Sequence, residues 1–168
     1  MCEDLRMRKA QPGDLKRLTE IYNEAILDGR CTCDTQVFTV EERREWMDSH
    51  NDPRYPLYVC EKGGIVVGYG YISKYRSGRM ALKDVAEISY YLDFSCRRMG
   101  IGTFIMGFLV EKARELAFKN LVAILLACNA GSIALLKKFG FEVWGILPKI
   151  ACLRDGNDYS HVYYGRKL

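Results

Sequence analysis

Residues 86–103 read Ala-Glu-Ile-Ser-Tyr-Tyr-Leu-Asp-Phe-Ser-Cys-Arg-Arg-Met-Gly-Ile-Gly-Thr, and they carry the most specific structural signal of the chain. Val85 to Leu92 is typical of a strand, and the apolar stripe from about Gly102 to Phe118 predicts a long helix. The two glycines between them let the backbone approach a ligand, because no Cβ stands in the way. The first turn of the helix also presents unpaired N–H groups and the positive end of its dipole. The turn therefore predicts a cradle for a pyrophosphate.

Several anion sites share this pattern. A dinucleotide site needs a third glycine where this chain has Ile105, and an acidic residue near Asn120, where there is none. A nucleotide P-loop needs a Gly-Lys-Ser/Thr triplet, which is absent. Coenzyme A bound through its pyrophosphate remains, beside the alternative of a turn that only joins a strand to a helix.

The rest of the chain alternates strands with helices. Strands are expected at Leu5–Lys9, Leu57–Glu61, Ile65–Lys74, Leu121–Cys128, Glu142–Ile150 and Tyr159–Arg166. Further helices are expected from Pro12 to about Leu27, from the capping box Thr39–Glu42 to about Ser49, and from Gly131 to Phe139. This order predicts a mixed α/β sheet with helices on its faces.

The composition narrows the class of protein to which this chain can belong. The chain has 168 residues, 49% of them apolar and 27% charged, which predicts a single domain over residues 1–168. No apolar run can cross a membrane, and the charged N-terminus is unlike a signal peptide, so we expect a cytoplasmic protein. The net charge of +4 is too mild for a nucleic-acid partner but suits a small anionic ligand. The seven cysteines are odd in number and lack metal-site spacing, so neither a disulfide framework nor a metal site is expected.

The stretch Arg97-x-x-Gly-x-Gly102, after a strand and before a helix, resembles the acetyl-CoA signature of the GNAT superfamily of N-acetyltransferases. Further segments resemble its phosphinothricin and amino-acid-analogue branch, so the resemblance covers about residues 6–168. They are Tyr22-Asn23, Thr39-Val-Glu-Glu-Arg43 with Trp46, Tyr55-Pro56, Ala86 to Leu92, Asn129-x-x-Ser132-Ile-Ala-Leu135, and Gly140-Phe141-Glu142.

The resemblance implies a mostly antiparallel central sheet with helices on both faces and two splayed strands that form a cofactor cleft. It implies acetyl-CoA as the cofactor, with its pantetheine on the splayed strand and its pyrophosphate on the glycine turn. The implied cofactor-binding residues are Tyr90, Tyr91, Leu92, Arg97, Arg98, Met99, Gly100, Ile101, Gly102, Thr103, Asn129 and Ser132. Asn129 and Ser132 have a second interpretation, as an ordinary helix N-cap.

The resemblance also implies the chemistry, which is direct attack of a small-molecule amine on the thioester. Glu87 is the expected base, acting through a water, and the alternative is a structural carboxylate paired with Arg or Lys. Ser89 and Arg79 are expected to contact the substrate, Arg79 through a carboxylate, although a solvated loop arginine is an equal interpretation. Where relatives carry a Tyr or His that protonates the departing thiolate, this chain has Leu136. The alternatives are acetylation of a protein N-terminus or an aminoglycoside, or a silent module that only binds coenzyme A. The family also implies a homodimer.

Two other features have ordinary interpretations. The charge run Glu41 to Glu45 is typical of a solvated helix face. Cys128 is expected to be a buried strand thiol rather than a nucleophile.

Overall fold

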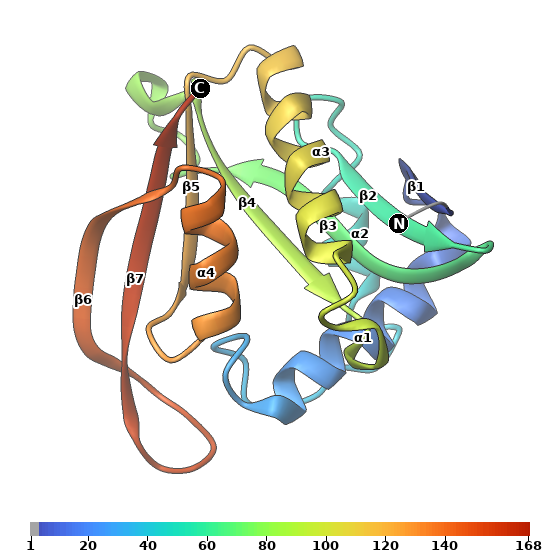
Figure 1. The fold of residues 1–168 in the computed structure, drawn as a ribbon, viewed down its shortest axis with the longest axis horizontal. Coiled ribbons are helices and arrows are strands. Elements are labelled where there is room, and N and C mark those ends of the chain that lie inside the picture. The colour runs from blue at the N-terminus through green and yellow to red at the C-terminus, as the bar shows by residue number, and fades with distance from the viewer. Residues whose placement is uncertain (1–3) are drawn as a thin grey trace.

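The structure, a computed structural model, describes residues 4–168, and its strands form one seven-stranded sheet in the order β1-β2-β3-β4-β5-β7-β6 (Figure 1). The strands are β1 (Leu5–Lys9), β2 (Leu57–Lys62), β3 (Ile65–Lys74), β4 (Val85–Leu92), β5 (Asn120–Leu126), β6 (Glu142–Cys152) and β7 (Asp158–Lys167). The helices are α1 (Leu15–Asp28), α2 (Arg44–Asp48), α3 (Ile101–Glu115) and α4 (Ala130–Lys138), with 3-10 turns η1 (Pro12–Asp14), η2 (Met80–Leu82) and η3 (Phe94–Cys96). The expected order of strands and helices is confirmed.

Strands β4 and β5 are the one parallel pair of this sheet, and every other neighbouring pair is antiparallel. Strand β4 pairs with β3 as far as Leu92, but it pairs with β5 only through Val85, Ala86 and Glu87. Beyond Glu87 the two strands part, as Figure 1 shows. The expected mostly antiparallel sheet with two splayed strands is therefore confirmed.

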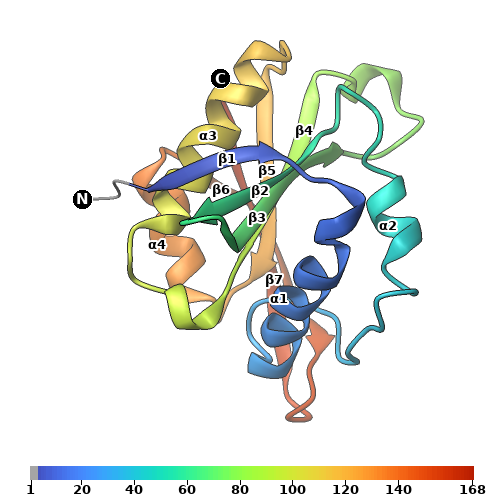
Figure 2. The same cartoon turned by 90° about the vertical axis from the view of Figure 1, so that its right-hand side faces the viewer.

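Helices cover both faces of the sheet, as expected (Figure 2). On one face, α3 and α4 pack over a large core that includes Ile105, Leu109 and Leu136. On the other face, Leu18 and Ile21 of α1 join Trp46 of α2 over a smaller core. Within the described residues, no helix combines the length and the apolar character that a membrane crossing requires.

Successive residues of β4 point to opposite faces of the sheet, because strand side chains alternate. Tyr90 and Leu92 contribute to the core under α3 and α4, whereas Tyr91 packs against the core under α1 and α2. Glu87 and Ser89 share the face of Tyr91 by the same alternation. One strand thus presents different residues to two sides of the molecule.

Several boundaries differ from the expectation by a few residues, including the start of α1 at Leu15 after the η1 turn and the ends of α3 and β5. Helix α3 ends at Glu115 rather than Phe118, because Ala117 adopts a left-handed conformation (φ 59°) that reverses the chain. Strand β5 ends at Leu126, so Cys128 lies in the turn before α4 and is half-buried, not a buried strand thiol.

The charge run before α2 also differs from the expectation. Thr39 and Glu42 do form the capping box, since the Thr39 N–H donates to Glu42 Oε2 at 2.7 Å and the Glu42 N–H donates to Thr39 Oγ1 at 3.3 Å. Yet the helix begins only at Arg44, and Arg43 is just 6% exposed. Its guanidinium carbon lies 3.7 Å from the ring centre of Trp46 and 4.2 Å from that of Tyr22. Cation–π contacts of this kind stabilise a buried arginine, so the interpretation of a wholly solvated face was wrong.

Candidate functional site

The glycine turn before α3 has the backbone of an anion cradle. Arg98 and Gly100 both have positive φ angles, of 62° and 82°. Alternation of ordinary and left-handed residues turns successive N–H groups toward one side. The first bond of the helix runs from the Phe104 N–H to the Gly100 carbonyl at 3.1 Å, so the N–H groups of residues 101–103 precede the helical ladder. Gly100 suits this place because a side chain is strained at such a φ angle.

Helix α1 holds the cradle in position. Asp93, directly after β4, accepts hydrogen bonds from the Ser95 N–H at 2.8 Å and the Ser95 hydroxyl at 2.6 Å, and it pairs with Arg17 of α1. Glu24, further along α1, accepts a hydrogen bond from the Phe94 N–H at 3.0 Å. The segment between the splayed strand and the turn is therefore fixed to a long helix at two points.

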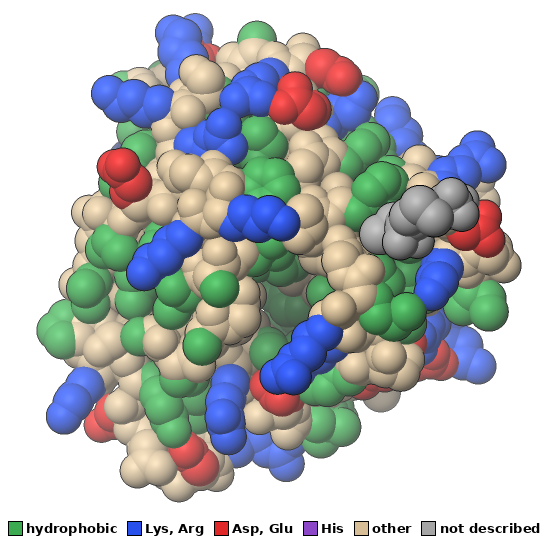
Figure 3. Space-filling view, viewed as in Figure 1, with side chains coloured by type: hydrophobic (Ala, Val, Ile, Leu, Met, Phe, Trp, Pro, Cys, Tyr) green, Lys and Arg blue, Asp and Glu red, His purple; other side chains and the backbone are tan. Residues whose placement is uncertain are grey.

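A cleft of about 580 Å³ lies where β4 and β5 have parted. It is lined by the end of β4, the glycine turn, the start of α4, and the end of α1 with the loop after it. Figure 3 shows a hollow in this face of the molecule with an apolar floor and Lys and Arg side chains around its mouth. An apolar channel with a cationic mouth suits a ligand that has an anionic head and an uncharged tail.

Ten of the twelve predicted cofactor-binding residues line this one cleft. They are Tyr90, Tyr91, Leu92, Arg97, Arg98, Gly100, Gly102, Thr103, Asn129 and Ser132. The other two do not: the side chain of Ile101 is 1% exposed in the core, and Met99 is 47% exposed outside the lining. Asn129 accepts a hydrogen bond from the Ser132 N–H at 3.1 Å, so it caps α4 and also lines the cleft. The two interpretations of Asn129 are thus compatible.

Arg97 spans the mouth of the cleft. Its guanidinium lies over the ring of Phe94, within 3.6 Å of Asp28 at the end of α1, and it donates to the thiol sulfur of Cys31 at 3.3 Å. Burial is the main reason that the pKa of Cys31 rises to about 11, so this thiol is neutral at physiological pH. Arg98 has no ion-pair partner among residues 4–168, which leaves its charge available to an anion.

Glu87 stands where the two strands separate, on the face of the sheet opposite Tyr90. It pairs in register with Ser73 on one side and Val122 on the other. Burial raises the pKa of the Glu87 carboxyl. No Lys or Arg of the described chain forms an ion pair with it, so the structural carboxylate of the alternative interpretation is not found. A half-buried, unpaired carboxylate of this kind is suited to accept a proton.

Ser89 and Arg79 lie in different surroundings. Ser89 faces Tyr71 in register, two residues beyond Glu87 on the same face of the sheet, and the ring of Tyr71 packs 5.6 Å from Trp46 and 4.8 Å from His50. Arg79 caps the short η2 turn in the exposed loop before β4, and its guanidinium forms no ion pair with the described residues. The structure thus places Ser89 beside Glu87 and leaves Arg79 on a solvated loop.

Sequence reasoning missed the contribution of α1 and the loop after it. Ala25, Asp28, Arg30 and Cys31 line the cleft, although they lie about sixty residues or more before the glycine turn. The sequence around Asp28 and Gly29 signals only the end of a helix. No local pattern indicates that Arg97 reaches Asp28, because that contact depends on how α1 crosses the sheet.

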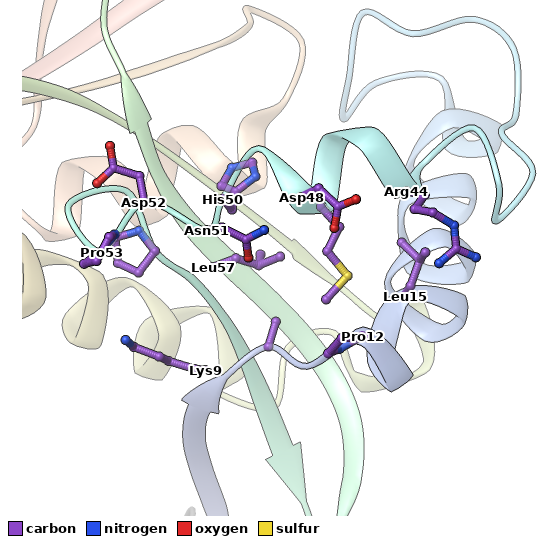
Figure 4. A pocket seen from close by; sticks show the side chains of 13 residues that line it. Lys9, Pro12, Leu15, Arg44, Asp48, His50, Asn51, Asp52, Pro53 and Leu57 are labelled. Carbon is purple, nitrogen blue, oxygen red and sulfur yellow. The ribbon is translucent and has the colours of Figure 1, made fainter.

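A second pocket, of about 270 Å³, lies elsewhere on the molecule (Figure 4). Its lining comes from β1, η1, the start of α1, α2 and the loop before β2, and includes Lys9, Leu15, Arg44 and His50. It contains no predicted site residue, whereas the cleft is lined by ten of them; Glu87, Ser89 and Arg79 line neither pocket. The cleft between β4 and β5 is therefore the candidate active site.

Known proteins resemble the chain over nearly its whole length. The profile of the acetyltransferase (GNAT) family matches residues 17–141. YwnH of Bacillus subtilis, provisionally named a phosphinothricin acetyltransferase, is 35% identical over 98% of this chain and 99% of its own.

Two solved structures share the fold closely. A GNAT superfamily phosphinothricin acetyltransferase from Sinorhizobium meliloti, in complex with acetyl-CoA, aligns with a TM-score of 0.91 at 30% identity over 98% of this chain and 89% of its own. A ribosomal-protein-alanine N-acetyltransferase from Brucella melitensis aligns with a TM-score of 0.91 at 31% identity over 97% of this chain and 99% of its own.

Proposed function

We propose that this chain, which belongs to the GNAT family of acetyltransferases, acetylates the primary amine of an amino-acid analogue of the phosphinothricin type. The chain is an N-acetyltransferase, and acetyl-CoA is its cosubstrate. The observation that carries the proposal is the parting of β4 from β5 directly after an unpaired, half-buried Glu87. A cofactor channel and a proton acceptor thus meet at one point of the sheet.

The residues of the cleft fit acetyl-CoA. The N–H groups of residues 101–103 and the charge of Arg98 are suited to its pyrophosphate. The backbone of β4 from Ile88 to Leu92 has no partner from β5, so its free N–H and C=O groups can pair with the amides of pantetheine as a neighbouring strand would. When bound, the cofactor supplies an activated acetyl thioester.

Glu87 then acts as the base. A protonated amine cannot attack a carbonyl carbon, so a proton must leave it before the new bond forms. The carboxylate takes that proton through a water, and burial brings its pKa closer to the pH at which the protein works. A backbone N–H of the splayed strand stabilises the oxyanion that develops on the acetyl carbonyl.

The acceptor approaches from the face of the sheet opposite the cofactor channel. Glu87, Ser89 and Tyr71 share that face, with Trp46 beside them. An amino-acid analogue also carries a carboxylate, and we assign its recognition to Arg79, which has no partner in the exposed loop before β4. The relatives named after phosphinothricin support an acceptor of this class.

One relative supports a second candidate acceptor. The neighbour from Brucella melitensis is named for the alanine of a ribosomal protein, and an N-terminal alanine also carries an α-amine. The two candidate acceptors differ at the carboxyl end of the residue that carries the amine. A free amino acid ends there in a carboxylate, whereas in a peptide the chain continues as an amide.

The test is a panel of amines with acetyl-CoA, in which the release of free thiol is measured. The panel contains phosphinothricin, methionine sulfoximine, free amino acids, peptides with N-terminal alanine, polyamines and aminoglycosides. We expect turnover with phosphinothricin or methionine sulfoximine and roughly tenfold or more lower kcat/KM for their carboxamides, because the charged hydrogen bonds to Arg79 are lost. Preference for the peptides would transfer the assignment to the second candidate, and turnover confined to aminoglycosides would overturn both.

We also propose that the protein is a homodimer joined through β6. Among the described strands β6 is an edge of the sheet. Its large apolar side chains are unusually exposed: Val143 at 49%, Trp144 at 47%, Ile146 at 57%, Leu147 at 41% and Ile150 at 58%. An exposed apolar edge strand invites pairing with another chain, and a second copy presents a matching one.

A further inference from the structure

The proposed mechanism leaves the departing sulfur without a partner. The position at which relatives carry a Tyr or His is Leu136, and Leu136 is 1% exposed in the core beneath α3 and α4. Its neighbour Leu135 lines the cleft instead. Neither leucine can donate a hydrogen bond to the sulfur.

Tyr90 has a hydroxyl with no partner. The ring of Tyr90 lines the cleft beside Ser132 and Leu135, and its hydroxyl oxygen is buried with no hydrogen bond to the described part of the chain. A buried hydroxyl without a partner costs free energy, which a ligand in the cleft can recover by accepting its proton in a hydrogen bond. Tyr90 also lies on the strand segment that has no partner from β5.

The other tyrosine of the cleft is not suited to this role. Tyr91 points to the opposite face, where its ring packs edge-on 4.8 Å from that of Tyr22 and 5.4 Å from that of Tyr69. Its side chain belongs to the aromatic core under α1, whereas that of Tyr90 faces the helices that enclose the cofactor channel.

We propose that the Tyr90 hydroxyl donates a hydrogen bond to the sulfur of coenzyme A, which it stabilises as a thiolate when the acetyl group leaves. The inference rests on the proposed function, because it assigns a residue to the leaving group of that reaction.

The hydroxyl donates the hydrogen bond and keeps its proton. Burial raises the pKa of Tyr90 to about 12; the Ser132 side chain lies near its hydroxyl and lowers the pKa by less, but the two form no hydrogen bond. A simple thiol has a pKa of about 8.5. Transfer of the proton from Tyr90 to the thiolate is therefore unfavourable, and the thiolate leaves the cleft to be protonated by water. The acetyl–sulfur bond breaks, the electron pair stays on sulfur, and Tyr90 returns unchanged.

The test compares two ligands that differ only at the sulfur. Calorimetry measures the affinity of the protein for coenzyme A and for desulfo-coenzyme A at about pH 7 and about pH 9, on either side of the ordinary thiol pKa. In the unaltered protein, we expect the ratio of the two affinities to shift toward coenzyme A at the higher pH, since more of its thiol is then ionised. Tyr90→Phe should lower the affinity for coenzyme A at the higher pH by roughly tenfold or more, as expected for a lost hydrogen bond to a charged atom. Its affinity for desulfo-coenzyme A should stay the same.

The matched control is Tyr69→Phe. Tyr69 carries another buried hydroxyl without a hydrogen bond, but it lies under α1 and outside the cleft lining. This variant should bind both ligands as the unaltered protein does.

The remaining outcomes of these binding measurements overturn either the inference or the proposed function. Equal affinities of Tyr90→Phe and the unaltered protein for coenzyme A at both pH values overturn the inference. Equal losses for both ligands also overturn it, because the hydroxyl then contacts another part of the cofactor. If Tyr90→Phe does not fold, an affinity ratio that does not change with pH in the unaltered protein overturns it too. Failure of the unaltered protein to bind either ligand rejects the proposed function itself.

Discussion

Glu87 and Val122 form the last pair that joins β4 to β5, and the two strands part directly after it. The carboxylate therefore stands where the two strands part, on the face of the sheet opposite Tyr90, and Glu87 is not among the residues that line the cleft. A base at this point can reach an amine that approaches from the α1 and α2 side while the cofactor occupies the other side. This geometry supports the proposed direct transfer, in which the two substrates meet without a covalent enzyme intermediate.

Removal of the proposed base should slow turnover. Glu87→Gln keeps the size of the side chain but cannot accept a proton, so we expect kcat at neutral pH to fall about 10²-fold or more. Acetyl-CoA affinity, measured by calorimetry, should stay the same. Glu45→Gln, at an exposed glutamate of α2, is the matched control and should leave both quantities unchanged. A Glu87→Gln variant with the original rate removes this residue from the mechanism.

The raised pKa of Glu87 also predicts how stability depends on pH. The folded protein holds the Glu87 proton more tightly than the unfolded chain does, so this group favours folding at low pH and opposes it as pH rises through the raised pKa. Glu87→Gln should therefore be more stable than the unaltered protein near neutral pH, and the difference should shrink below the ordinary glutamate pKa of 4.5. Thermal unfolding at neutral pH and below that value measures this, and equal shifts at both would contradict it.

The pH dependence of the activity should also report the ionisation of Glu87. The base works only when it is ionised, so kcat/KM should fall as pH decreases through the raised pKa of Glu87. We expect the midpoint of this acid limb above the ordinary value of 4.5. An acid limb that persists unchanged in Glu87→Gln would belong to another group.

The cradle can be tested through its left-handed glycine. Gly100→Ala forces a side chain into a backbone with φ of 82°, which costs about 1–2 kcal/mol of folding free energy. It should also weaken acetyl-CoA binding, because the N–H groups around residue 100 shift. Gly140→Ala, with φ of 74° at the end of α4 and outside the cleft lining, is the matched control. Thermal unfolding should show similar losses of stability in the two variants. Calorimetry should show weaker acetyl-CoA binding only in Gly100→Ala.

The edge strand provides a test of assembly. Ile146→Asp places a charge among the exposed apolar side chains of β6, so we expect a monomer in place of a dimer. Light scattering coupled to gel filtration measures the mass directly. Ile65→Asp, at an isoleucine of β3 that is also exposed, should leave the mass unchanged. A monomer in the unaltered protein at micromolar concentration rejects the proposed dimer.

The sequence predicted the elements of the fold because their signals are local. The glycine turn, the strand before it and the helix after it are specified within residues 86–103, and many of the residues that line the cleft come from this stretch. The environment of Arg43 could not be predicted in this way, because its burial depends on Tyr22 and Trp46, which belong to different helices. The Arg97–Asp28 contact and the free hydroxyl of Tyr90 also arise only when distant elements meet.

The position of β7 has a consequence for synthesis. Residues 158–167 come after every other strand in the sequence, yet they lie between β5 and β6 inside the sheet. On the ribosome, β5 and β6 emerge first, and the edges that β7 will cover stay bare until it arrives. The β5 edge of the nascent chain thus remains unpaired for as long as β7 is in the exit tunnel. We expect chaperones that bind unpaired strand edges to engage the chain during that interval.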